Sequence, residues 1–565
     1  MSQVHLTRRS ALRWALASTV GGLLPIGATS AWARANAAMT TDLALHLSQR
    51  LGYGPVPGQL TQLSQQGWQA YLNEQLDPQR LPLPVALSSA LGGFKTLGWS
   101  QTELIAKYRR AGKEARQAKQ KDQARGSTMK FDLARQVGLE AAEARILRAM
   151  HSPRQLEEVL VEFWFNHFNV FIGKGMCRVL MGSYEQQAIR PFVLGRFRDM
   201  LGATAKHPAM LFYLDNWMSV GGGSGNKPAA RAKADKPKKP SGLNENYARE
   251  LMELHTLGVD GGYTQRDVTE LARIFTGWGL NMRPEGEDNA FEFAPARHDP
   301  GEKEWLGRRI KPEGQAEGEL ALDVLAKHPA TARHISRKLA QYFVADMPPA
   351  SLVDKLAARF TQTDGDLKAV TRALLESPEF AAASAQGNKF KPPYRYLLSV
   401  LRACDTQDIE VRPMVAVLQR LGMPLFGSPT PDGYKYTEQA WLSPDALQSR
   451  VSFATAFASG RLPELEQEDD DEPGMREMAG KPRKAEKGEK GDKPNKANKG
   501  EGRVTNIEDK AARVGNSRFW GAIDADALLK ALGPAISPKT RAVVEQSEPV
   551  LRAALVLGSP DFMRY

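Results

Sequence analysis

The chain has 565 residues, of which 42% are hydrophobic and 25% charged, an ordinary composition for a globular protein. Its net charge of +12 would suit a nucleic-acid-binding protein. However, four polar stretches, residues 1–39, 110–130, 221–242 and 464–503, together account for the whole excess. The rest of the chain is electrically balanced, which argues against a nucleic-acid partner. No later segment is apolar enough to cross a bilayer, so no transmembrane segment is expected in the mature protein.

Residues 1–37 have the layout of a twin-arginine export signal. Arg8 and Arg9 precede a mild apolar run, and two small-residue cleavage sites of the Ala-x-Ala type follow it. Ala11 departs from the usual pattern, which most often has Phe at that place. The alternative is an ordinary secretory signal or a short anchor. We therefore expect a periplasmic or secreted protein.

The two cysteines, Cys177 and Cys404, could pair in an oxidising compartment. Their spacing matches no metal or redox motif. Two unpaired, buried thiols are the favoured interpretation.

The remainder reads as a mainly α-helical fold. One helical domain is predicted over residues 41–462 and 504–565, interrupted by polar inserts near 110–130 and 221–242. The first insert is expected to be a solvated helix or a disordered excursion, and the second to be disordered, as is a linker over 463–503. Residues 291–309 alternate apolar side chains around a Pro-Gly turn, which predicts a small β-hairpin.

Residues 244–280 concentrate acids, amides, His and aromatic side chains between two predicted helices. Asn244 suits the start of a helix that ends near Gly258, and Thr264 with Asp267 forms a capping box for the next helix. These residues are explained by helix geometry alone.

Glu250, Glu253 and His255 invite interpretation as a metal site. On an α-helix, however, His255 would lie about 140–160° from both glutamates, so one helix cannot close that site. We expect His255 to pack in the core. The acidic face, with Glu250 and Glu253 as candidate catalytic residues beside Arg249, is the better functional candidate, although an ion-pair network between helices would have the same pattern.

His167 lies in the most aromatic run of the chain, residues 162–169, together with Asn166 and Asn169. If these polar side chains are buried, they must be hydrogen-bonded. His167 is therefore a candidate metal ligand, with a purely structural role as the alternative.

His298 and Asp299 are adjacent in the predicted hairpin, with Lys303 beyond its turn. A His-Asp pair resembles the ligand dyad of metal phosphohydrolases, but the other ligands of that motif are not identifiable here. Because functional residues favour loops, His298 and Asp299 are candidate metal ligands and Lys303 is a candidate catalytic residue.

Five segments in order carry a resemblance to a known family. They are FWFNHFNVF (163–171), HPAMLFYLDNWMS (207–219), the stretch 244–280, HDPGEKEWLG (298–307) and HPATARHISRKLAQYFV (328–344). Together they resemble the bacterial domain-of-unknown-function family 1800 over nearly all of the mature chain. The resemblance implies a large, mainly helical exported protein without an established activity, often encoded beside an exported sulfatase-like protein.

Two functions remain open from the sequence. The first is a metal-assisted hydrolase, with an unidentified divalent metal and a site assembled from His167, the Glu250/Glu253 face and the His298-Asp299 pair. The second is a non-enzymatic binding or assembly partner of the sulfatase-like protein. Whether the protein is an enzyme is not decided by the sequence.

Overall fold

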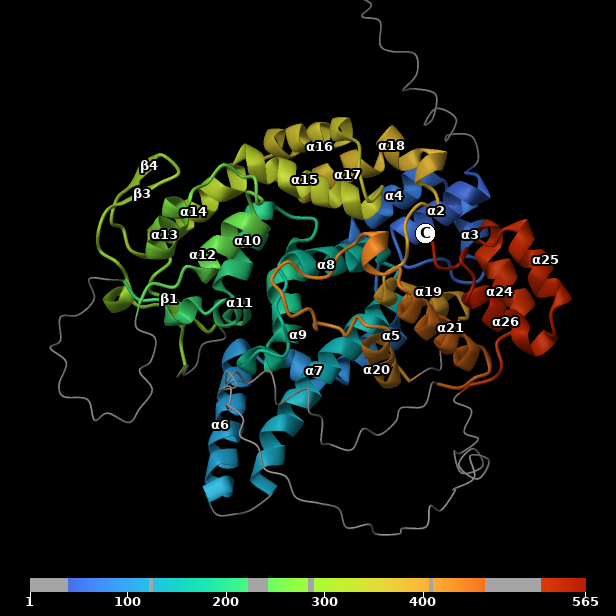
Figure 1. The fold of residues 1–565 in the computed structure, drawn as a ribbon, viewed down its shortest axis with the longest axis horizontal. Helices are drawn as coiled ribbons and strands as arrows, with labels where there is room; N and C mark the ends of the chain where they lie inside the picture. Colours follow the sequence, from blue (N-terminus) through green and yellow to red (C-terminus); the bar gives the residue numbers. More distant parts are fainter. Residues whose placement is uncertain (1–38, 121–124, 222–241, 283–288, 406–409, 463–519) are drawn as a thin grey trace, which may run out of the picture.

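The computed structural model of the chain describes residues 39–120, 125–221, 242–282, 289–405, 410–462 and 520–565. The predicted export signal, nearly all of the insert at 221–242 and the linker at 463–503 lie outside these ranges. The fold is mainly α-helical, as predicted, with two small two-stranded sheets (Figure 1).

The first half contains α2 (Thr41–Arg50), α3 (Gln59–Gln66), α4 (Trp68–Gln75), η1 (Pro78–Arg80), α5 (Val85–Gly92), η2 (Lys95–Gly98), α6 (Gln101–Gln120), α7 (Arg125–His151), α8 (Gln155–His167), η3 (Gly175–Val179), α9 (Met181–Tyr184), η4 (Glu185–Ile189), η5 (Arg190–Phe192), α10 (Phe197–Lys206), α11 (Pro208–Tyr213), η6 (Asn216–Met218), α12 (Asn246–Glu250), η7 (Leu251–His255) and α13 (Gln265–Ile274). The strands are β1 (Trp278–Leu280), β2 (Phe291–Phe293), β3 (Lys303–Trp305) and β4 (Arg308–Ile310), with η8 (Pro295–Arg297) between β2 and β3. The second half contains α14 (Gln315–Lys327), α15 (Pro329–Phe343), α16 (Ala350–Gln362), α17 (Leu367–Leu375), α18 (Pro378–Ala381), η9 (Ala383–Ala385), α19 (Pro393–Ala403), α20 (Arg412–Arg420), η10 (Glu438–Ala440), α21 (Pro444–Ala458), α24 (Ala525–Leu532), η11 (Gly533–Ala535), α25 (Pro538–Gln546) and α26 (Pro549–Leu557).

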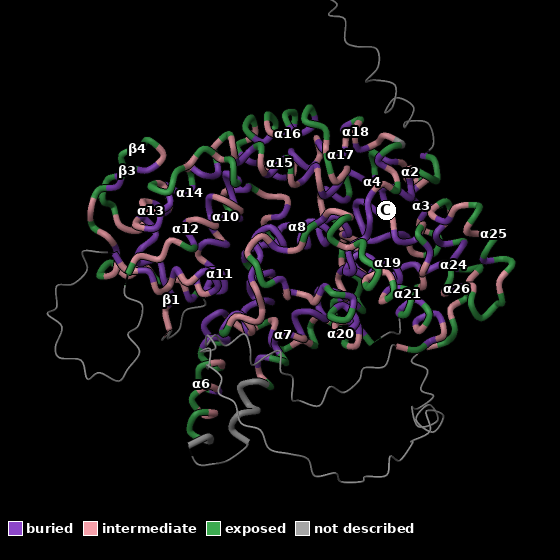
Figure 2. The backbone as a smooth tube through the Cα atoms, viewed as in Figure 1, coloured by how far each residue is buried: buried purple, intermediate pink, exposed green. Residues whose placement is uncertain are grey.

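Helix α8 lies at the centre of the fold, and every one of its 13 residues is buried (Figure 2). Its apolar side chains belong to one continuous hydrophobic core that reaches from α2 to α26. Its acids are also inside the protein: Arg190 donates to Glu158 with two hydrogen bonds of 2.7 and 2.9 Å, whereas Glu162 accepts only from Tyr342 Oη, at 3.0 Å, among the described residues. Burying a carboxylate is tolerable only with such a partner.

Helices α6 and α7 pack against each other and project from the body as an antiparallel pair (Figure 1). The polar insert predicted near 110–130 falls on this pair, and its described residues are helical. This is the solvated-helix alternative of the prediction.

The end of the chain is tied to the segment before α19. Lys389 and Tyr565 exchange two backbone hydrogen bonds of 3.2 and 2.9 Å. The C-terminal helices α24 and α26 pack beside α19 and α21, and η11 contacts α2, which brings the two ends of the described chain together (Figure 1).

The predicted hairpin over residues 291–309 is wrong in its pairing. Strand β2 pairs with β1, and β3 pairs with β4 in a separate sheet. The tight turn lies at Leu306 and Gly307, both of which have positive φ, at 48° and 70°. A two-residue loop of that conformation matches the twist of the flanking strands, whereas the Pro-Gly pair at 300–301 lies in the segment before β3.

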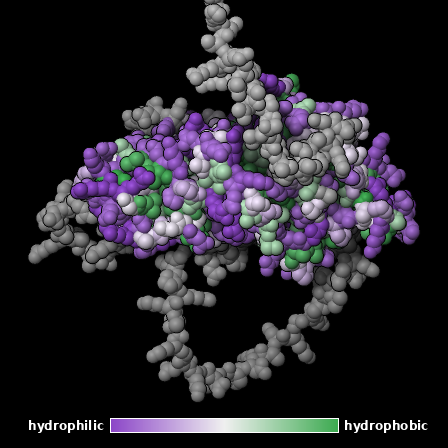
Figure 3. All heavy atoms as spheres, turned by 90° about the horizontal axis from the view of Figure 1, so that it is seen from above, coloured by the Kyte–Doolittle hydropathy of each residue, from purple (hydrophilic) through white to green (hydrophobic). Residues whose placement is uncertain are grey.

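Hydrophilic residues dominate the face drawn in Figure 3, where hydrophobic residues form small separate groups. Within the described ranges, no helix combines the length and the hydrophobicity needed to cross a membrane. Neither thiol forms a disulfide, and Cys177 is buried whereas Cys404 is half-buried.

Candidate functional site

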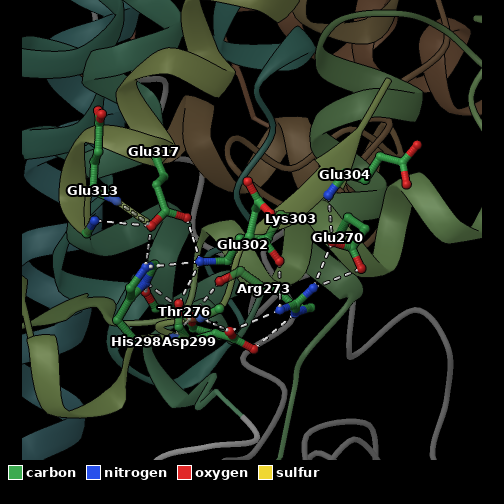
Figure 4. A network of polar contacts seen from close by, with 12 residues as sticks. Glu270, Arg273, Thr276, His298, Asp299, Glu302, Lys303, Glu304, Glu313 and Glu317 are labelled. Atoms are coloured by element: carbon green, nitrogen blue, oxygen red, sulfur yellow. Dashed lines mark hydrogen bonds and ion pairs between the residues drawn. The ribbon is translucent and has the colours of Figure 1, made fainter. Parts of the chain in front are cut away.

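The six residues predicted to carry chemistry fall into two separate groups. His298, Asp299 and Lys303 meet between the end of α13, strand β3 and the start of α14 (Figure 4). His167 lies at the end of α8 against η7, the element that follows Glu250 and contains Glu253. Among the described residues, no hydrogen bond, ion pair or ring contact joins the first group to the second.

The first group is centred on Glu317, which the sequence analysis missed. Its Oε2 accepts a hydrogen bond of 2.6 Å from Lys303 Nζ, and its Oε1 lies 2.9 Å from His298 Nε2 (Figure 4). Oε1 also accepts the backbone N–H groups of residues 313 and 314, at 3.0 and 3.1 Å, which makes Glu317 part of the N-terminal cap of α14. The Glu317 and Lys303 side chains are both 0% exposed. Lys303 Nζ also donates to Asp299 O at 2.6 Å.

The hydrogen bonds around Thr276 show that Nδ1 of His298 is a donor. Thr276 Oγ1 gives its only proton to Arg273 O, at 2.5 Å, and accepts from the Asp299 N–H at 2.8 Å. His298 Nδ1, which is 2.8 Å from Thr276 O, must therefore be a donor. Nε2 lies 2.9 Å from Glu317 Oε1 and 3.4 Å from Lys303 Nζ. His298 and Lys303 thus share one carboxylate.

The charged state of Glu317 agrees with this account. Burial by itself would raise the pKa of its carboxyl group, but the hydrogen bonds from His298 and Lys303 outweigh burial and hold the pKa below its ordinary value. His298 and Lys303, bound to one buried carboxylate, link β3, α14 and the loop after α13.

Both carboxylate oxygens of Asp299 also accept hydrogen bonds from the protein. Its two oxygens accept from Arg273 Nε and Nη2, at 3.0 and 3.1 Å, and Oδ1 also accepts from the Gly301 N–H at 2.9 Å. Burial opposes ionisation, but the bonds from Arg273 and Gly301 keep the pKa of Asp299 low. Both ring nitrogens of His298 likewise have protein partners, Thr276 O at 2.8 Å and Glu317 Oε1 at 2.9 Å. These contacts do not support the predicted metal roles of His298 and Asp299.

The second group is built on an irregular turn. The helix predicted from Asn244 to Gly258 is α-helical only over α12, and η7 is a π-helix. A π-turn advances each residue by a smaller angle than an α-turn, so the angles expected from a single α-helix do not hold here. Such turns occur often at functional sites. Gly258 then ends the segment at φ +86°, as a C-cap glycine does.

Two imidazoles donate hydrogen bonds to the last carbonyl oxygens of this turn. His167 Nε2 donates to His255 O at 3.1 Å, and His334 Nε2 donates to Leu254 O at 3.2 Å. The ring centroids of His255 and His334 each lie 6.2 Å from that of His167. His255 is in the core, as predicted, at 2% exposed. His167 Nδ1 and His255 Nε2 are buried without a hydrogen-bond partner among the described atoms.

All three imidazoles are neutral at physiological pH. Burial, reinforced by the charge of Lys338, lowers the pKa of His255 to about 3 and that of His334 to about 4. The same two causes hold the pKa of His167 well below its ordinary value. Neutral imidazoles can accept a proton or a metal. Nevertheless, no three His, Cys, Asp or Glu side chains of the described residues are grouped so that they could hold a metal ion.

Lys338 lies one helical turn after His334 on α15 and was also missed from the sequence. Its half-buried ammonium has no hydrogen bond or ion pair to the described residues. Burial, together with repulsion from Lys435, lowers its pKa to about 8, although Asp432 opposes the shift. A lysine in this state exists partly as the free amine near neutral pH.

The pKa of Glu250, on the acidic face of α12, is shifted upward, whereas that of Lys338 is shifted downward. Burial, with repulsion from Glu253 and Asp432, raises the pKa of Glu250. Glu253 accepts a long hydrogen bond of 3.5 Å from Tyr263. The charge of Asp432 therefore influences the pKa of both Glu250 and Lys338.

The loop that carries Asp432 is fastened to α8 by the two asparagines of the aromatic run. Asn166 exchanges hydrogen bonds of 2.7 and 2.8 Å with the backbone of Tyr434, and Asn169 donates to Ser428 O and Thr430 O, at 3.0 and 2.8 Å. The hydrogen bonds expected for these buried amides are therefore present. They attach the loop to α8, near the junction of α8, η7 and α15.

The comparisons with known proteins give the family but no activity. No curated protein matches the chain, and no solved structure matches it. One family profile matches residues 46–564, nearly the whole described chain. The chain belongs to this family, which is described as a protein of unknown function (DUF1800).

Proposed function

We propose that the chain is an exported hydrolase that works by acid–base catalysis at the junction of α8, η7 and α15. The observation that carries the proposal is a pair of opposed shifts, a raised pKa for the carboxyl group of Glu250 and a lowered pKa for the amine of Lys338, both of which the charge of Asp432 influences. Catalytic acids and bases need pKa values moved toward the working pH, and opposed shifts in one place are typical of such pairs.

In this proposal Lys338 acts as the general base. Its free amine accepts a proton from water, and the resulting hydroxide attacks the carbonyl carbon of an ester or a similar bond. Glu250 then gives its proton to the leaving oxygen. Glu253 supports this role because its charge raises the pKa of Glu250. No step is assigned to a metal, since the described residues do not bring three ligands together.

The test uses the full chain purified from the periplasm, with p-nitrophenyl acetate and butyrate as probes. Lys338→Met is expected to abolish hydrolysis, and Glu250→Gln to lower kcat at least tenfold. Lys355→Met is the matched control, because Lys355 is an exposed lysine on α16 that pairs with Glu379. Absence of hydrolysis in the wild type, or full activity in Lys338→Met, would contradict the proposal. Loss of activity on treatment with a chelator, restored by a divalent metal, would favour the metal-assisted alternative.

A non-catalytic role as a binding or assembly partner of an exported sulfatase-like protein is the second candidate. One observation favours it: His167 and His334 each have a structural use as donors to the last carbonyls of η7. Co-purification with that protein, and its loss on deletion of this chain, is the expected result. If each protein stays stable and active without the other, this candidate fails.

Export through the twin-arginine pathway is also a proposal, supported by Arg8, Arg9 and the run that follows them. Changing both arginines to lysine should retain the protein in the cytoplasm, as measured by cell fractionation. Unchanged periplasmic yield would contradict it.

A further inference from the structure

Arg450 is a buried cation without a counter-charge. It lies on α21, is 1% exposed, and none of its three guanidinium nitrogens has a hydrogen-bond partner among the described residues. Burial lowers its pKa to about 10, and the hydroxyl of Tyr396 opposes the shift. A guanidinium removed from water normally has a carboxylate, carbonyl or water against it.

A second cation lies nearby and is also without an acid. Lys391 is 2% exposed, and its ammonium donates to Phe562 O at 2.6 Å. Its pKa is held well below the ordinary value by burial and then by repulsion from Arg395 and Arg450. Arg395, in contrast, donates to backbone oxygens and to Tyr342 Oη, and although burial opposes its charge, Tyr342, Tyr565 and Glu162 outweigh burial and raise its pKa. Arg450 and Lys391 therefore lie in the part of the core where α21 packs against α26 beside α19 (Figure 1).

Aromatic rings compensate part of this charge. The guanidinium carbon of Arg450 lies 4.5 Å from the Phe390 ring centroid and 5.1 Å from that of Tyr396, and Lys391 Nζ lies 4.1 Å from the Phe562 ring centroid. Ring faces attract cations but offer a guanidinium no lone pairs in its own plane. The five N–H groups of Arg450 still need an acceptor.

We propose that the guanidinium of Arg450 binds a small inorganic anion, such as chloride, in the core between α19 and α21. The anion accepts the N–H groups of Arg450 that lack partners and supplies the negative charge that Arg450 and Lys391 lack. A small monatomic ion suits this place because the surrounding aromatic side chains leave Arg450 1% exposed.

The test measures unfolding of the full chain at constant ionic strength while bromide replaces methanesulfonate. A bound anion stabilises the native state by mass action, so bromide at a hundred times its Kd should lower the unfolding constant about 100-fold. Arg450→Met should lose this dependence. Arg402→Met is the matched control: Arg402 is also buried, but its guanidinium donates to Gly54 O and Met150 O, so its loss should destabilise the protein and leave the bromide dependence intact.

A crystal of the wild-type protein soaked in bromide gives an independent measurement that requires no variant. We expect an anomalous peak within hydrogen-bond distance of the Arg450 guanidinium. Three results would overturn the proposal: no peak there, no effect of bromide on wild-type unfolding, or an Arg450→Met variant that keeps the effect. In the absence of an anion, Arg450→Met should instead be more stable than the wild type in every salt, because an apolar side chain relieves an unpaired buried charge.

Discussion

Glu317 and Lys303 form an ion pair of 2.6 Å in which neither side chain has any exposed surface. His298 Nε2 lies 2.9 Å from the other oxygen of Glu317, so that one carboxylate binds two side chains. Such a cluster is stable only while every member has its partner, because each unpaired buried charge would be left in a medium of low dielectric constant. The network behaves as a tie between strand β3 and the start of α14.

Replacing Glu317 by Gln should therefore destabilise the protein by about 3–5 kcal/mol, the range for breaking a buried ion pair. Urea unfolding followed by circular dichroism measures it. The matched control is Glu304→Gln, which removes the acid of an exposed pair with Arg266, 63% and 69% exposed. An exposed pair contributes at most about 1 kcal/mol. Equal losses in the two variants would show that the Glu317 network is not a tie.

The local features of the fold were predictable because they depend on neighbours in the sequence. The capping box of Thr264 and Asp267 is present as predicted, since its two hydrogen bonds close within one helical turn. Pro329 begins α15 for the same kind of reason: its missing N–H costs nothing in the first turn. The mainly helical class follows from periodicity over many such segments.

The site was predictable only in part, because its geometry depends on distant segments. Glu317 lies 14 residues from Lys303 and 19 from His298, and nothing in its own sequence context marks it as their partner. Lys338 is one of many lysines, and its lowered pKa arises from burial and from Lys435, 97 positions away by residue number. The π-turn at η7 has no sequence signal of the kind that Gly and Pro give. The sequence therefore indicated individual site residues but did not indicate which of them lie together.

Acid should destabilise the protein through its buried neutral imidazoles. Burial lowers the pKa of His207 to about 3, whereas an unfolded His titrates near 6.5. Between these values the unfolded chain binds one more proton at this site than the native protein, so its contribution to stability is complete above pH 6.5 and is lost as pH falls toward 3. Each such His contributes a slope of about 1.4 kcal/mol per pH unit within that window.

Between pH 4.5 and 6, the variant His207→Gln should have a smaller slope of unfolding free energy against pH than the wild type. The difference should equal the contribution of one histidine. Urea titrations at four pH values measure the slope. The comparison is His328→Gln, a partly exposed histidine whose Nδ1 caps α15 as His207 Nδ1 caps α11, so both variants lose the same hydrogen bond. An unchanged slope in His207→Gln would mean that His207 is protonated in the native state.

The loop over the candidate site should depend on the lack of a side chain at Gly433. A Cβ built there, at φ +69°, would lie 2.4 Å from Asn166 O, so Gly433→Ala must move the loop away from α8 and weaken the Asn166–Tyr434 bonds. Gly422→Ala is the control, since its φ is similar, at +83°, and nothing lies within 4 Å of its Cβ. Strain alone costs about 1–2 kcal/mol at either position.

We expect Gly433→Ala to lose clearly more stability than Gly422→Ala in urea unfolding. If Asp432 positions the acid and the amine as proposed, Gly433→Ala should also lose hydrolysis of p-nitrophenyl acetate while Gly422→Ala retains it. Matching behaviour of the two variants would show that the loop tolerates displacement from α8.

The two thiols should be inert in the native protein. Cys177 and Cys404 form no disulfide, and burial raises the pKa of each to about 12. Because only the thiolate reacts, neither should be labelled by iodoacetamide at pH 8 within a time that labels free cysteine completely. Both should react in 6 M guanidinium chloride, as counted by intact mass. Labelling of Cys404 alone in the native state would show that the end of α19 opens locally, whereas failure of both to react after unfolding without reductant would reveal a disulfide and contradict the structure.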